Sequence, residues 1–240
     1  MAFVDISPLN VLGATGSPRV LRVTDTFNRA ALNPSGKPIW TEYIMFKLPV
    51  GTPYLIGGYG GSTAPVGLNM TCLGQNNATS PYPAVLQCIG LDSSVWGKSQ
   101  YMQATYVQQS AVVMSAGPAV MVDVQGSIAS NGACYAVLFI GGPASRLVKM
   151  TGGSNLWTEN SLVDPIPGDV PTNGDVYRIA CQVGASNIIT VKKNGVQIAT
   201  FTDNTPLSTG LPGFTQSSIQ QTAGVDGSVI MSNVDCGLGL

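Results

Sequence analysis

The sequence contains no histidine. Histidine is the usual general base beside a nucleophilic serine or cysteine, and it is the commonest side-chain ligand of transition metals. Its absence excludes Ser-His-Asp and Cys-His catalysis. The five cysteines have no C-x-x-C or other metal-ligand spacing. Their odd number and their position in apolar or small-residue runs predict reduced, buried thiols rather than disulfides. They are Cys72, Cys88, Cys134, Cys181 and Cys236.

Charge is also scarce. Only 10% of the residues are charged, where about 25% is typical of soluble domains. Eleven Lys and Arg against twelve Asp and Glu give a net charge of −1, without a basic stripe. We therefore expect no nucleic-acid partner. A surface of uncharged polar residues fits a durable shell or a face covered by neighbouring chains, and it fits a neutral secreted β domain equally well.

Long apolar runs are missing. The longest, residues 111–122, is interrupted by Ser115 and Gly117-Pro118 and is too short to cross a bilayer. The N-terminal MAFVDISPL lacks the basic region that precedes a secretory signal. We expect no membrane association, and synthesis and assembly in a cytoplasm.

Helical periodicity is absent, and Gly and Pro interrupt the chain too often for long helices. About a dozen short strand patterns follow one another, which predicts a single all-β domain built as a two-sheet sandwich or jelly roll. The continuous apolar run ACYAVLFIG, residues 133–141, predicts a strand buried on both faces. Residues 1–24 mix short apolar pieces with Gly and Pro, which indicates an extended arm ahead of a domain spanning residues 25–240; an ordinary first strand is the alternative.

The clearest local pattern is a β-hairpin over residues 188–201. Asn194-Gly195 supplies the two positive φ angles that a type I′ turn needs. The predicted cross-strand pairs are Lys193–Val196, Val191–Ile198 and Ile189–Thr200, which would gather Ile189, Val191, Val196 and Ile198 on one buried face. Lys192 and Lys193 are interpreted as solvated residues beside the turn.

Five segments in order resemble one known superfamily. They are DTFNRA (25–30), WGKSQYMQATYV (96–107), GDVYRIACQV (174–183), VKKNGVQIATFTDNTPLSTGLPGF (191–214) and NVD (233–235). The set resembles the concanavalin A-like lectin/glucanase superfamily, and is most similar to the laminin-G-like jelly-roll domains of tailed-bacteriophage structural proteins. The resemblance covers about residues 25–240. It implies an all-β, two-sheet antiparallel jelly-roll sandwich with its first and last strands side by side.

Members of that superfamily bind glycans, mediate adhesion, cleave polysaccharides or serve as rigid virion modules, and fold alone does not choose among them. From the resemblance we expect a structural virion protein of a tailed phage, assembled in the host cytoplasm. In this role it would decorate or cement the capsid, or form a head fibre. Its N-terminal arm would dock on the major capsid protein or a tail protein, and a homotrimer is favoured. The alternative is a tail-associated module that binds a host polysaccharide, and the third hypothesis is a glycoside hydrolase.

Carboxylates decide the third hypothesis. Hydrolytic members of the superfamily use clustered carboxylates, whereas this chain has Glu42 and Glu159 as its only glutamates and no E-x-D-x-x-E pattern. Asp164, Asp169 and Asp175 lie close in sequence, but their proline-rich loop favours a role in turns. We therefore expect that the chain is not an enzyme.

No cofactor is expected, with calcium as the candidate metal. If the terminal strands are neighbours, as the resemblance implies, Asp25 and Asp235 approach one another, and two facing carboxylates need a cation between them. Arg29 or Arg178 could supply that charge instead, as a structural salt bridge.

Sugar binding needs exposed aromatic platforms near amides or acids. The candidate glycan-binding residues are Tyr59 in a glycine-rich loop, Tyr82 between two prolines, and Trp157 beside Asn155. The alternative is that Trp157 packs in the core and that the tyrosines anchor loops or interfaces.

Overall fold

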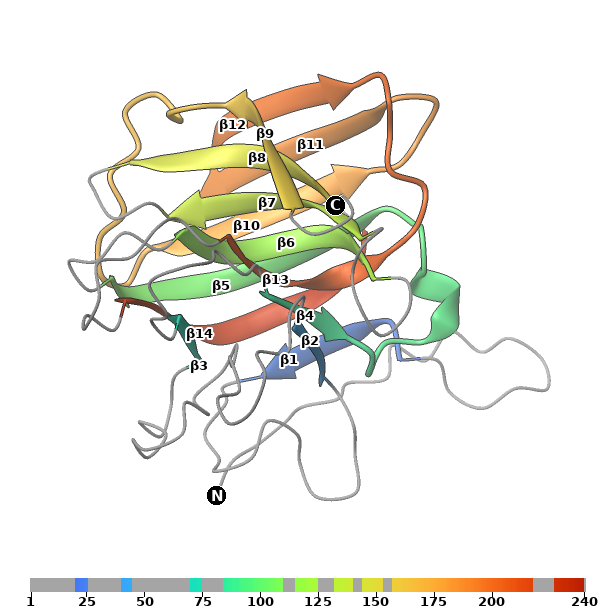
Figure 1. Cartoon of the computed structure of the whole chain (residues 1–240), viewed down its shortest axis with the longest axis horizontal. Helices are drawn as coiled ribbons and strands as arrows, with labels where there is room; N and C mark the ends of the chain where they lie inside the picture. Colours follow the sequence, from blue (N-terminus) through green and yellow to red (C-terminus); the bar gives the residue numbers. More distant parts are fainter. Residues whose placement is uncertain are drawn as a thin grey trace.

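Two antiparallel β-sheets lie face to face in the described part of the chain (Figure 1). The computed structural model describes residues 20–25, 40–44, 70–74, 84–109, 115–124, 132–139, 144–152, 157–217 and 227–239. All strand pairs among these residues are antiparallel. The arrangement confirms the predicted two-sheet jelly-roll sandwich.

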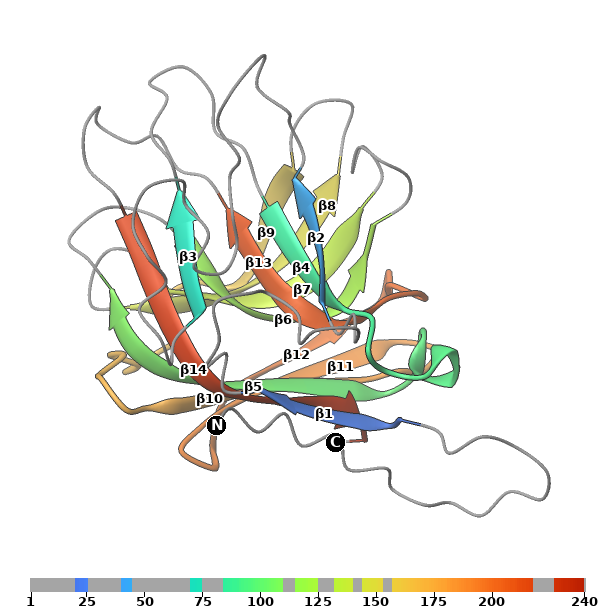
Figure 2. The ribbon, with the colours of Figure 1, turned by 90° about the horizontal axis from the view of Figure 1, so that it is seen from below.

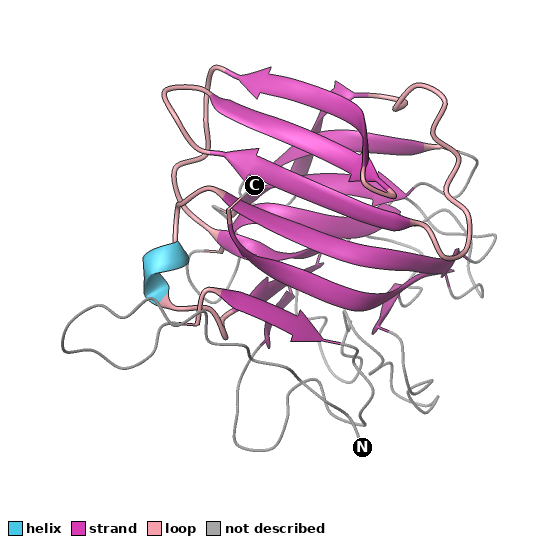
Figure 3. Cartoon of the chain, turned by 180° about the vertical axis from the view of Figure 1, so that it is seen from behind, coloured by secondary structure: helices cyan, strands magenta, loops and turns pink. Residues whose placement is uncertain are grey.

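The first sheet, sheet A, has the strand order β1-β14-β5-β10-β11-β12, and β3 also pairs with β14. Its strands are β1 (Arg22–Asp25), β3 (Met70–Gly74), β5 (Gln100–Gln109), β10 (Val176–Gln182), β11 (Asn187–Lys193), β12 (Val196–Asp203) and β14 (Gly227–Leu238). Figure 3 shows this sheet from its outer side, with its long strands running side by side.

The second sheet, sheet B, has the order β2-β4-β13-β6-β7-β8-β9. Its strands are β2 (Trp40–Ile44), β4 (Ala84–Cys88), β6 (Ser115–Asp123), β7 (Ala133–Phe139), β8 (Ser145–Gly152), β9 (Trp157–Val163) and β13 (Leu211–Ser217). Figure 2 shows the two sheets stacked, with the strands of each curving along their length. The short 3₁₀ turn η1 (Ser93–Val95) leads from β4 to β5, and no helix in the described ranges is long and apolar enough to span a membrane.

The first and last strands are neighbours, as the family resemblance implies. β1 pairs with β14 so that Arg22 faces Gly237 and Thr24 faces Asp235. β1 thus begins inside the expected arm and crosses the expected domain boundary at residue 25. Residues 1–19 of that arm lie outside the described residues, so its docking role stays a prediction.

Aromatic side chains connect the two sheets at the core. Phe139 of β7 lies edge-on to Tyr106 of β5 and to Tyr177 of β10, with ring centroids 5.0 Å and 4.7 Å apart. Edge-to-face pairs contribute about 0.5–1.5 kcal/mol each beyond the area they bury. Because Phe139 comes from sheet B and both tyrosines from sheet A, these contacts fix how the sheets are stacked.

β7 is buried on both of its faces, as the continuous apolar run predicts. Its inward residues are Tyr135, Val137 and Phe139, and its outward residues are Cys134, Ala136 and Leu138. Each is at most 1% exposed. The outward residues form a second hydrophobic cluster with side chains of β6 and β8. Over these strands, sheet B therefore has an apolar, buried outer face.

The hairpin turn forms as predicted. Asn194 and Gly195 have φ angles of 51° and 83°, as a type I′ turn requires. The predicted pair Lys193–Val196 is confirmed. Farther from the turn, however, a β-bulge between Val191 and Lys192 changes the register.

The two remaining predicted pairs are wrong because of this bulge. Val191 pairs with Ala199 instead of Ile198, and Ile189 pairs with Phe201 instead of Thr200. The bulge places one extra residue on β12, so every later side chain on that strand changes face. Val196 lies between the turn and the bulge and keeps its predicted partner, yet it is 67% exposed, so its predicted burial is wrong independently of the bulge.

Four cysteines are buried free thiols, which confirms their prediction; they are Cys88, Cys134, Cys181 and Cys236. Burial, with a further contribution from Asp203, raises the pKa of Cys181 to about 12. This thiol is therefore protonated at neutral pH and unreactive. Cys72 lies in β3, and its side chain is outside the described residues.

Gly210, in the TGLPGF segment, has a steric role. It has φ of 129°, and a Cβ atom there would lie 2.3 Å from the carbonyl carbon of Met121. The fully buried Gln100 holds the same crossing, because its Nε2 donates to the Gly210 carbonyl at 3.0 Å and its Oε1 accepts from the Met121 N–H at 3.1 Å. The segment thus marks the point where β13 enters the sandwich against β6.

Candidate functional site

The outer face of sheet A is polar, in contrast to the outer face of sheet B. Ile179 and Cys181 of β10 and Ile189 and Val191 of β11 point into the core. Since successive side chains on a strand point to opposite faces, the residues between them point outward. They are Arg178, Ala180 and Gln182 on β10, and Ile188, Thr190 and Lys192 on β11.

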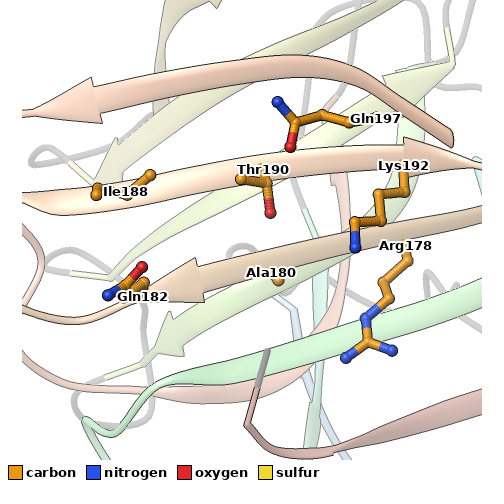
Figure 4. A pocket seen from close by; sticks show the side chains of 7 residues that line it. All are labelled: Arg178, Ala180, Gln182, Ile188, Thr190, Lys192 and Gln197. Atoms are coloured by element: carbon orange, nitrogen blue, oxygen red, sulfur yellow. The ribbon is translucent and has the colours of Figure 1, made fainter. Parts of the chain in front are cut away.

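These outward residues, with Gln197 of β12, line a groove of about 190 Å³ (Figure 4). The register sets them in cross-strand pairs along the groove: Arg178–Lys192, Ala180–Thr190 and Gln182–Ile188. Figure 4 shows the two basic residues at one end of the groove, with Gln182 and Ile188 at the other. Ala180, the smallest of the seven, forms the low point between them because its neighbours extend farther from the sheet.

A chain of contacts holds the basic end of the groove. The guanidinium carbon of Arg178 lies 3.8 Å from the centroid of the Tyr101 ring. The Tyr101 hydroxyl donates to Asp235 at 3.0 Å, and Arg22 binds both carboxylate oxygens of Asp235 at 2.8 Å. Burial first, and the Asp235 charge second, raise the pKa of Tyr101 to about 12. The ring therefore stays neutral and provides a fixed support for Arg178.

Most of the described basic residues have a carboxylate partner. The pairs are Arg22–Asp235, Arg146–Glu159, Lys149–Asp203 and Lys193–Asp169. Arg178, Lys192 and Lys98 differ, because they form no ion pair with any residue in the described ranges. Of these three, Arg178 and Lys192 are direct cross-strand neighbours, and the groove that they line includes no carboxylate among its described residues.

The expected calcium pair is not brought together. Thr24, rather than Asp25, is opposite Asp235, so the two carboxylates point to opposite faces of sheet A. Asp25 is 2% exposed and accepts a hydrogen bond from the indole Nε1 of Trp40 at 2.8 Å. Asp235 lies on the outer face with Arg22. The predicted proximity is corrected by this register. Among the described residues Arg22, and not Arg178, forms the ion pair with Asp235, and Arg29 lies outside the described residues. No group of three metal-binding side chains occurs within the described ranges.

Two of the loop aspartates meet at one lysine. The ammonium of Lys193 lies 3.1 Å from Asp169 and 2.9 Å from Asp175. Asp169 also accepts hydrogen bonds from the hydroxyls of Tyr177 and Ser145. This arrangement corrects the interpretation of Lys193 as a solvated residue: its side chain is 18% exposed and fastens the loop before β10 to the hairpin.

Asp175 has the turn role that the sequence indicates. It accepts hydrogen bonds from the backbone N–H and the hydroxyl of Thr172, both at 2.7 Å. Burial alone would raise the pKa of Asp175, but hydrogen bonds from Lys193, Thr172 and Asn194 outweigh it and hold that pKa well below its usual range. The carboxylate is therefore ionised and engaged.

A second buried ion cluster surrounds Asp203 at the end of β12. Its carboxylate accepts hydrogen bonds from the Tyr135 hydroxyl at 2.6 Å, the Lys149 ammonium at 2.7 Å and the Thr205 N–H at 2.9 Å. Burial opposes ionisation, yet these partners lower the pKa of Asp203 to about 2. The cluster ties sheet A to β7 and β8 of sheet B, so Asp203 has a structural role.

The predicted glycan-binding aromatic side chains all fall outside what the structure describes, so their role stays a prediction. Tyr59 and Tyr82 are outside the described residues. Trp157 begins β9, the last strand of sheet B, and its side chain is outside them too. Sequence reasoning does not find the groove, because its residues come from strands whose register the sequence does not reveal. One signal in the sequence points to it: Arg178 and Gln182 are polar and Ala180 is small, and they alternate with the apolar residues of the same strand.

Comparison with known proteins places the chain by its fold. No protein-family model matches it, and no curated protein matches it. Among solved structures it is similar to a native glycosidic hydrolase, with a TM-score of 0.55 at 9% identity, covering 90% of this chain and 95% of that one. A β-1,3-1,4-glucanase (lichenase) from a mouse hindgut metagenome gives 0.54 at 10% identity, covering 90% and 99%. The β-glucanase of Bacillus licheniformis gives 0.53 at 10% identity, covering 91% and 98%. These likenesses show that the chain has a concanavalin A-like jelly-roll fold.

This finding overturns the expectation that the chain is not an enzyme. These three structures, which share the fold over about nine tenths of this chain, are named as a glycosidic hydrolase and two glucanases. The expectation depended on the lack of a contiguous carboxylate motif. Carboxylates can converge in space without such a motif, as Asp169 and Asp175 do at Lys193. The absence of the motif therefore does not exclude an enzyme.

Proposed function

We propose that this protein recognises a carbohydrate, and that a glycan chain lies along the groove on the outer face of sheet A. The observation that carries the proposal is the groove itself, a row of hydrogen-bonding side chains on an exposed sheet face. The solved structures with the same fold that act on glycans, two of them glucanases, support this ligand class.

The lining suits a sugar chemically. The amides of Gln182 and Gln197 and the hydroxyl of Thr190 both donate and accept hydrogen bonds, as sugar hydroxyls require. Ala180 and Ile188 provide apolar surface for the C–H faces of sugar rings, and Ile188 is 38% exposed. Convergent polar groups around a small apolar floor are typical of ligand sites.

Binding to oligosaccharides tests the proposal with an isosteric pair of variants. Thr190→Val removes a hydroxyl from the groove, whereas Thr158→Val removes one from an exposed position of β9 in the other sheet. Loss of one hydrogen bond is worth about 1 kcal/mol, or about fivefold in affinity. We expect that loss for Thr190→Val and no change for Thr158→Val, measured by calorimetry on the oligosaccharide that binds best on an array. A blank array, or equal affinities of the two variants, would contradict the proposal.

The same samples test hydrolysis. Two solved structures with the same fold are named as a glycosidic hydrolase and a β-glucanase. Hydrolysis of each bound glycan is therefore measured alongside binding, as the release of reducing ends. No carboxylate lines the groove within the described ranges, and Asp169 is a buried partner of Tyr177 and Lys193. Release of reducing ends would therefore assign cleavage to carboxylates elsewhere on the chain, and binding without release supports recognition alone.

A second proposal, from the sequence resemblance, is that this recognition domain belongs to the virion of a tailed phage and docks through its N-terminal residues. The low charge of the chain and the DTFNRA and TGLPGF segments support it. Since β1 begins at Arg22, a deletion of residues 2–19 removes the arm and leaves the strand. Loss of incorporation into particles with unchanged thermal unfolding is expected, and normal incorporation would refute arm docking. The copy number per particle separates capsid decoration from a tail appendage.

A further inference from the structure

We infer that the glycan bound in the sheet A groove is acidic, with carboxylate groups on its sugar rings that pair with Arg178 and Lys192. This inference rests on the proposed function and specifies its ligand class. The first observation is that Arg178 and Lys192 are direct cross-strand neighbours on the exposed face. Like charges directly opposite one another destabilise a sheet, so a ligand anion between them removes an unfavourable contact as well as adding a favourable one.

The second observation is the absence of an internal counter-charge. Neither residue forms an ion pair with any described residue, and the groove lining contains no carboxylate within the described ranges. Asp235 is the carboxylate linked to Arg178 through Tyr101, and it already has other partners. It accepts hydrogen bonds from Nε and Nη2 of Arg22 and from the Tyr101 hydroxyl. The positive charge at this end of the groove is therefore available to a ligand.

The third observation is the fixed position of Arg178. Its guanidinium lies 3.8 Å from the Tyr101 centroid, and that ring is held by its hydrogen bond to Asp235. A planar guanidinium that is already positioned loses less conformational freedom when it binds a carboxylate through two parallel hydrogen bonds. Lys192 adds a second donor from the neighbouring strand.

The shape of the groove fits a linear acidic chain. From Arg178 to Gln182 the strand advances four residues, which is about 13 Å at 3.3 Å per residue. The basic pair lies at one end, and the amide of Gln182 lies at the other (Figure 4). A glycan whose charged ring lies at the Arg178–Lys192 pair would thus place its next rings beside Thr190 and Gln182, which form uncharged hydrogen bonds.

Oligogalacturonate and its methyl ester provide the test, because esterification removes the charge and keeps the sugar. Lys192→Gln is the groove variant. Lys98→Gln is the matched control, since Lys98 is exposed, has no ion pair in the described ranges and is not part of the groove lining. Titration calorimetry with the full chain measures each affinity at low and high salt.

We expect oligogalacturonate to bind more tightly than its methyl ester. Lys192→Gln should weaken that binding about tenfold, and Lys98→Gln should not change it. Added salt should weaken the acidic ligand selectively, because the groove is exposed. Lys192→Gln should unfold at the same temperature as the native chain or slightly above it, which excludes misfolding as the cause.

Equal affinity for the acid and the ester, or equal loss in both lysine variants, would overturn the inference while leaving glycan recognition in place. Failure of both ligands, together with a blank neutral array, would remove the proposed function itself. Binding of the acid that survives Lys192→Gln and Arg178→Gln together would place the acidic site elsewhere and also overturn the inference.

Discussion

Replacing Asp203 with asparagine should change how stability depends on pH. Asp203 is 6% exposed and accepts hydrogen bonds from Tyr135 and Lys149. These contacts lower its pKa from 3.8 to about 2. A depressed pKa means that the unfolded state binds protons first as the pH falls, so the stabilisation is present above pH 4 and is lost as the pH approaches 2.

The magnitude follows from the shift. Since one pKa unit corresponds to about 1.4 kcal/mol, this carboxylate contributes roughly 2 kcal/mol near neutral pH. Urea unfolding of the native chain and of Asp203→Asn at pH 6 and pH 2.5 measures it. We expect the free energy of unfolding of the variant to be lower than that of the native chain by about 2 kcal/mol at pH 6. At pH 2.5 this difference should be less than half of its value at pH 6. Parallel loss of stability in both proteins would refute the reasoning.

Three further predictions concern the structural residues. Gly210→Ala should lower the free energy of unfolding by about 2 kcal/mol or more, because its Cβ would lie 2.3 Å from Met121 at a φ that L-residues rarely adopt. Gly174→Ala is the control and should lower that free energy by less, since the space around Gly174 is open. A larger loss for Gly174→Ala than for Gly210→Ala would contradict this account. Gln100→Leu should cost about 1–3 kcal/mol by leaving the Met121 N–H without the amide that now accepts from it, whereas the exposed Gln197→Leu should leave the thermal midpoint unchanged. Lys193→Met should remove the shared ion-pair partner of Asp169 and Asp175. It should therefore lower the free energy of unfolding more at pH 7 than at pH 2. An equal loss at the two pH values would show that Lys193 does not stabilise the ionised form of these carboxylates.

Sequence reasoning predicts the fold here because it depends on repeated local signals. Asn194-Gly195 specifies its turn, and the apolar run of β7 specifies a strand buried on both faces. Such signals are redundant, so a single irregularity leaves the architecture intact. The bulge at Val191/Lys192 illustrates this point, since it moved the partners of β12 by one residue without disturbing the sheet.

The candidate site depends on register, which is not local. Asp25 and Asp235 do lie on neighbouring strands, but an offset of one residue places them on opposite faces. Lys192 and Lys193 look alike in sequence, yet one lines an exposed groove and the other joins two loop aspartates. Which lysine faces which way follows from the pairing of β10 with β11. The groove could therefore be found only once the sheet was assembled.

The most direct test of the central claim is to locate the bound glycan on the chain. Backbone amide chemical shifts of the isotope-labelled protein, followed during titration with the glycan that binds best, report which residues it contacts. The account predicts that the largest changes fall on β10 and β11, at residues 178–182 and 188–192, and on Gln197 of β12. Changes confined to sheet B, with β10 and β11 unaffected, would contradict it.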